Sequence, residues 1–173
     1  MDNKIYYKAK RFFPDKTYED FSGITAREEI VTFDSLCEVV NVEGINGTEY
    51  LCDWNYGVSD LKVLLSKPLK HDEQIIACFR NPTKNHEFHK LDVRFEFCGY
   101  DLSDNTMTSA ITNSGGGFDK AIPYNTLNQY GLISNFNVAI TCRYLLEQLY
   151  GEIIVGDPHA YCDIFEIWRT LKL

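Results

Sequence analysis

Alternating apolar and polar positions predict the clearest strand of the chain at Leu91 to Tyr100. Period-two spacing places Leu91, Val93, Phe95 and Phe97 on one face and Asp92, Arg94, Glu96 and Cys98 on the other. The apolar face is expected in the core, since a slip of one residue would bury the charged side chains instead. A turn at Asp101 to Asn105 and an antiparallel return strand at Met107 to Asn113 are expected to follow.

Three further segments have the pattern of strands. Lys4 to Phe13 alternates, carries basic residues on one face and stops at Pro14, which predicts an edge strand. Gln74 to Arg80 is a continuous apolar run of strand length, so we expect it to be covered on both faces. Ala160 to Arg169 is apolar on both sides and is therefore expected inside the sheet and in the core.

A β-hairpin is predicted around Asn46-Gly47, because both residues tolerate positive φ in a tight turn. Its strands would be Glu38 to Val42 and Glu49 to Asp53. Just upstream, Ser35 to Val40 fits a short helix or a strand equally well, and the pattern leaves both open.

The best helical pattern runs from Ser134 to Tyr150, where Val138, Cys142, Leu145 and Leu149 recur at helical spacing. Ser134 or Asn135 would cap its N-terminus, and Gly151 would end it in the left-handed conformation. Together with the strands, this helix predicts an α+β fold. We expect residues 1–173 to form a single domain, with a mixed, largely antiparallel sheet packed against the 134–150 helix and followed by a final core strand.

The composition is that of an ordinary globular chain, with 45% hydrophobic and 24% charged residues among 173. No apolar run approaches the roughly 18 residues of a membrane span, and the N-terminus lacks the pattern of a secretory signal. We therefore expect a cytoplasmic protein. The six cysteines are scattered without CxxC spacing, which favours buried thiols over a zinc site or a redox pair.

Charge is distributed very unevenly. The net charge of −8 disfavours binding to nucleic acid or to an anionic membrane. Between Asp15 and Asp60 there are eleven acidic and two basic residues, so this segment carries −9 and the rest of the chain +1. Such a segment suits a surface that steers a basic protein partner. A solvated acidic face is the simpler alternative.

The acidic segment also contains Tyr50 to Gly57 (YLCDWNYG), in which aromatic rings alternate with polar groups. At an interface such rings supply buried area, whereas in a monomer they would turn inward. The residues that we expect to bind a protein partner are Asp34, Glu38, Glu49, Asp53, Trp54 and Tyr56.

A glycine-rich loop at residues 114–118 is the first candidate for chemistry. Its glycines would let backbone N–H groups converge on an anion, which would suit a small-molecule or nucleotide-binding enzyme. No Lys-Ser or Lys-Thr follows and the spacing is not GxGxxG, so a turn or a packing contact is the alternative explanation. The loop residues concerned are Ser114, Gly115, Gly116 and Gly117.

Histidines and cysteines offer weaker candidates. His86 with His89, or His159 with Cys162, would need two further ligands to hold zinc, and none is present at compatible spacing. Cys98 as a nucleophile would need an electropositive environment that nothing nearby supplies. We therefore expect no metal, no cofactor and no catalytic residue.

Four motifs in the C-terminal half resemble uncharacterised bacterial proteins associated with polymorphic-toxin systems. They are FCGYDL (97–102), SAITNSGGGF (109–118), NQYGLI (128–133) and HAYCDIFEIWR (159–169). The resemblance implies an immunity-type role, in which a small cytoplasmic protein binds and blocks a cognate toxin, and it transfers no site residues. The sequence thus leads to a non-enzymatic acidic binding protein, an immunity-type inhibitor of a basic toxin such as a nuclease. The oligomeric state stays open.

Overall fold

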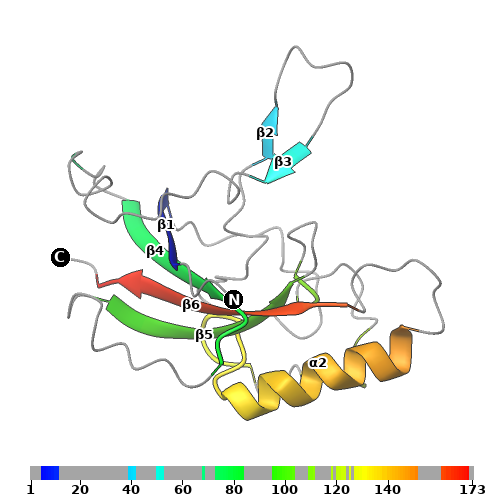
Figure 1. The fold of residues 1–173 in the computed structure, drawn as a ribbon. Helices are drawn as coiled ribbons and strands as arrows, with labels where there is room; N and C mark the ends of the chain where they lie inside the picture. The colour runs from blue at the N-terminus through cyan, green and yellow to red at the C-terminus, as the bar shows by residue number, and fades with distance from the viewer. Residues whose placement is uncertain are drawn as a thin grey trace.

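The computed structural model describes residues 5–11, 39–41, 50–52, 68, 73–83, 95–103, 109–111, 118, 120–123, 125, 127–151 and 161–171. Within them the chain forms a four-stranded sheet and one long helix, α2 (Phe136–Tyr150), which packs against one face of the sheet (Figure 1). The predicted α+β fold, with a sheet packed against a C-terminal helix, is confirmed.

The sheet has the order β1-β4-β6-β5, and each neighbouring pair is antiparallel. Its strands are β1 (Ile5–Arg11), β4 (Glu73–Arg80), β5 (Phe95–Ser103) and β6 (Asp163–Thr170). The N-terminal strand lies at an edge and the last strand lies in the interior, as the sequence predicted. β4 and β6 are far apart in sequence, so their pairing is a long-range contact that no local pattern could predict.

A separate two-stranded sheet confirms the strands of the predicted hairpin. β2 (Val39–Asn41) pairs antiparallel with β3 (Tyr50–Cys52). For Ser35 to Val40, where helix and strand were both open, the structure shows a strand at residues 39 and 40. The predicted Asn46-Gly47 turn lies outside the described residues.

The two central strands are buried on both faces. In β4 all residues from Gln74 to Phe79 are buried, and in β6 the same holds from Ile164 to Ile167. Because neighbouring residues of a strand point to opposite faces, this burial shows that both sides of the sheet are covered here. The continuous apolar run at Gln74 to Arg80 had predicted this.

The structure corrects the prediction for β5. The strand continues through Asp101, Leu102 and Ser103, where a turn was expected, and residues 91–94 lie outside the described part. Its ladder is formed with β6, and of the predicted return strand 107–113 only residues 109–111 are described. In that segment Ser109 makes a single bridge to Ser103, and a turn follows directly. Since Ser103 also pairs with Asp163 of β6, Ser109 meets the other edge of β5, and the turn after it places Ala110 and Ile111 in the core.

A bulge between Phe97 and Gly99 explains why strict alternation fails in β5. Gly99 has φ of +143°, and a Cβ there would lie 2.6 Å from Leu132 Cβ, so only glycine fits. Cys98, expected on a polar face, is buried instead. Asn128 fastens the bulge, because its Nδ2 donates to the Cys98 carbonyl at 2.6 Å.

The N-cap of helix α2 is Asn135, one of the two caps predicted, and the first helical residue is Phe136. The Asn135 side chain accepts from the backbone N–H groups of Asn137 and Val138. The buried stripe consists of Ala139, Cys142 and Leu146. Val138 was expected in the core but is 38% exposed, because the side of the helix that faces the core is centred on Ala139 and Cys142 instead.

The C-terminus of α2 also differs from expectation. Gly151 has φ −64° and ψ −30°, which is right-handed rather than left-handed. A Cβ at this position would lie 2.5 Å from the Glu147 carbonyl oxygen and 3.0 Å from the Tyr161 hydroxyl. Close approach of backbone and ring, not positive φ, is therefore what favours glycine here.

Candidate functional site

A pocket of about 320 Å³ opens where the start of α2 meets the sheet. β5 contributes Phe97 and Tyr100 and β6 contributes Glu166 and Trp168 to its walls, and residues 134–136 complete it. Tyr100 and Glu166 are buried at its base, whereas Ser134 and Asn135 are exposed at its rim. The pocket therefore combines four aromatic rings with one carboxylate.

The carboxylate is the most unusual feature of this pocket. Glu166 lies on the same side of β6 as Ile164 and Trp168, and only 1% of it is exposed. Its Oε1 accepts a hydrogen bond of 2.7 Å from the indole Nε1 of Trp168. The start of α2 contributes the positive end of a helix dipole to the same pocket.

The aromatic rings contact one another around the pocket. The Phe97 ring lies 5.0 Å from that of Tyr100 and 5.1 Å from that of Trp168. The Phe136 ring, from the first turn of α2, lies 5.4 Å from Tyr100. Aromatic rings prefer such tilted and edge-on contacts, so the rings that form the walls of the pocket stabilise one another.

The pKa of Tyr100 is raised by its surroundings in the pocket. Burial, together with the negative charge of Glu166 and a hydrogen bond to it, raises the pKa of the Tyr100 hydroxyl to about 12. The tyrosine consequently keeps its proton at neutral pH and is a hydrogen-bond donor beside Glu166.

On the opposite face of the sheet, the guanidinium group of Arg169 contacts a carboxylate and an aromatic ring. Its Nε donates to Glu96 Oε1 at 2.5 Å, its Nη2 donates to the Tyr130 hydroxyl at 3.0 Å, and its Cζ lies 4.5 Å from the centre of the Tyr130 ring. Burial raises the pKa of Tyr130, so its hydroxyl keeps the proton that it donates to Glu96 at 3.3 Å. Glu96 and Arg169, which lie opposite each other on neighbouring strands, thus form a cross-strand ion pair.

Other buried polar groups hold the fold together. Asp101 is fully buried, and its Oδ1 accepts from the Ser109 hydroxyl at 2.6 Å and from the Leu102 N–H at 2.8 Å. Ser109 Oγ in turn accepts from the Ile111 N–H at 3.1 Å. Asp101 and Ser109 therefore fix the 109–111 turn against the strand, and the hydrogen-bonding capacity of these buried groups is used within the fold.

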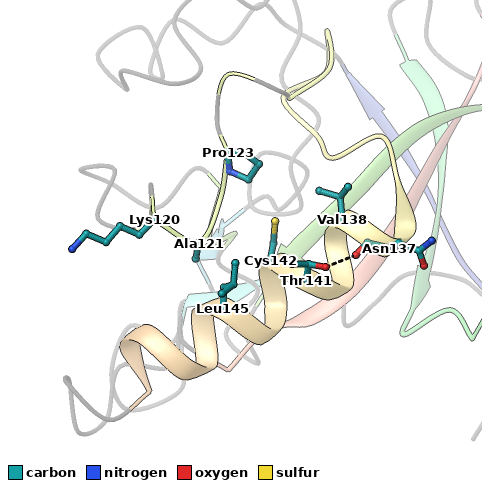
Figure 2. A pocket seen from close by; sticks show the side chains of 8 residues that line it. All are labelled: Lys120, Ala121, Pro123, Asn137, Val138, Thr141, Cys142 and Leu145. Atoms are coloured by element: carbon teal, nitrogen blue, oxygen red, sulfur yellow. Dashed lines mark hydrogen bonds between the residues drawn. The ribbon is translucent and has the colours of Figure 1, made fainter.

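A second hollow, of about 380 Å³, lies between α2 and residues 120–123 (Figure 2). Ala121 and Pro123 form one wall, and the helix forms the other. Figure 2 shows Lys120 extending away from it and the Cys142 sulfur directed into it. Burial raises the pKa of the Cys142 thiol, which makes it a poor nucleophile. This groove is mainly apolar and supplies no constellation for chemistry.

Most of the residues that the sequence singled out lie outside the described part of the chain. This holds for the six expected partner-binding residues Asp34, Glu38, Glu49, Asp53, Trp54 and Tyr56, and for the loop residues Ser114, Gly115, Gly116 and Gly117. His86, His89 and His159 lie outside it too, so those hypotheses stay predictions. Cys98 is described, buried and 3.9 Å from the Glu96 carbonyl oxygen.

Sequence reasoning missed the pocket, although a signal for it existed. In Ala160 to Arg169 the positions that share a face read Ile164, Glu166, Trp168, so one carboxylate interrupts an apolar face of a strand expected in the interior. The partner rings come from positions far away in sequence, and no local pattern links them to it.

The four motifs behind the family resemblance meet in space. Asn128 bonds the Cys98 carbonyl, Ser109 bonds Asp101, and Arg169 bonds Tyr130. In each contact a polar side chain of one motif is held by another, so these described residues serve the architecture.

Comparison of the chain with protein-family models, with curated proteins and with solved structures finds no match. Within the described residues, no group of three or more histidine, cysteine or acidic side chains is placed to hold a metal ion. Among the same residues, no helix combines the length and the apolar character needed to cross a membrane.

Proposed function

We propose that this protein is a non-enzymatic acidic binding protein of the immunity type, which neutralises a cognate bacterial toxin in the cytoplasm. The observation that carries the proposal is the separation of charge along the chain. Residues 15–60 carry −9, while the remainder carries +1. A field of one sign on one segment accelerates association with a partner of opposite charge, and a nuclease with a cationic substrate groove is such a partner.

The described half of the molecule is consistent with this role. Its buried polar residues Asp101 and Ser109 are bonded to each other, and Glu96 is bonded to Arg169. Partner-specific contacts are expected from Asp34, Glu38, Glu49, Asp53, Trp54 and Tyr56.

Co-purification tests the proposal. The tagged protein is used to capture the product of the adjacent gene, and the complex is compared with that of a variant in which Asp53, Trp54 and Tyr56 are replaced by alanine. We expect a stable complex with the wild-type protein, an association rate that falls with salt, and loss of the complex in the variant. Glu147→Ala, which removes an exposed acid of α2, is the matched control and should bind normally.

Two results would contradict the proposal. Failure to bind any basic toxin encoded by a neighbouring gene would contradict the immunity role. A tight complex that the triple substitution leaves unchanged would remove Asp53, Trp54 and Tyr56 from the interface.

A further inference from the structure

We draw no further inference here: the strongest candidate, the mainly apolar hollow between α2 and residues 120–123 into which the Cys142 sulfur points, carries none because nothing in the described part of the chain shows what covers it.

Discussion

Asn128 holds the bulge of β5 from outside the sheet, since its Nδ2 donates to the Cys98 carbonyl at 2.6 Å. The same side chain organises its own turn, because Oδ1 accepts from the N–H groups of Tyr130 at 2.9 Å and Leu132 at 3.1 Å. One amide thus joins the strand beside the Glu166 pocket to the segment that carries Tyr130.

We expect Asn128→Ala to lower the free energy of unfolding by about 2–4 kcal/mol, since three hydrogen bonds are lost and partly buried backbone groups are left without them. Asn128→Asp keeps the acceptor and loses the donor, so it should fall between alanine and wild type. Urea denaturation measures both, with Gln148→Ala at an exposed position of α2 as control. A loss below about 0.5 kcal/mol for Asn128→Ala would show that the bulge holds without it.

The pair Glu96 and Arg169 should stabilise the protein more than the pair Arg80 and Asp163. The side chain of Arg169 is 12% exposed and that of Glu96 32%, whereas Arg80 is 57% exposed. Water screens the second pair, so its coupling should lie below about 1 kcal/mol, against about 1–2 kcal/mol for the first. Double-mutant cycles with glutamine at each position measure both couplings. Equal couplings would contradict this ranking.

Stability should fall in alkali as the unfolded chain loses the Tyr100 proton. The pKa of Tyr100 is raised to about 12 in the folded protein, above the ordinary value of about 10. Between these values the unfolded state binds fewer protons than the folded state, so the free energy of unfolding decreases as pH rises. This contribution is complete below pH 10 and is lost by about pH 12.

Tyr100→Phe should flatten that decline, which urea midpoints measured from pH 9 to pH 12 would reveal. Tyr144→Phe, at an exposed position of α2, is the matched control. The interpretation fails if the pH dependence of the Tyr100→Phe protein matches that of the wild type.

Buried thiols should resist alkylation in the native protein. Burial raises the pKa of Cys142, and burial with the negative charges of Asp101 and Glu166 raises that of Cys78 well above its ordinary value. The thiolate, which is the reactive form, is therefore suppressed at both positions. Iodoacetamide labelling followed by peptide mass spectrometry should show modification of Cys78 and Cys142 only after denaturation. Rapid labelling of either thiol in the folded protein would contradict its burial.

Local patterns determined most of the secondary structure. The run from Gln74 to Arg80 gives β4, the apolar segment up to Arg169 gives β6, and the Asn135 cap with its helical spacing gives α2. Each depends on short-range chemistry: strand periodicity, apolar character and the capping of free N–H groups. The acidic charge of residues 15–60 is likewise a property of the sequence alone.

The tertiary structure decided what no local pattern contains. β5 extends through Ser103 because β6 pairs with it, and Cys98 is buried because Gly99 allows a bulge against Leu132. The pocket arises only when positions as distant as Phe97 and Glu166 are brought together by strand pairing. A pocket built from long-range contacts leaves one trace in the sequence here, a carboxylate on an apolar strand face. Burying that carboxylate costs free energy, which only partners supplied by the fold can offset.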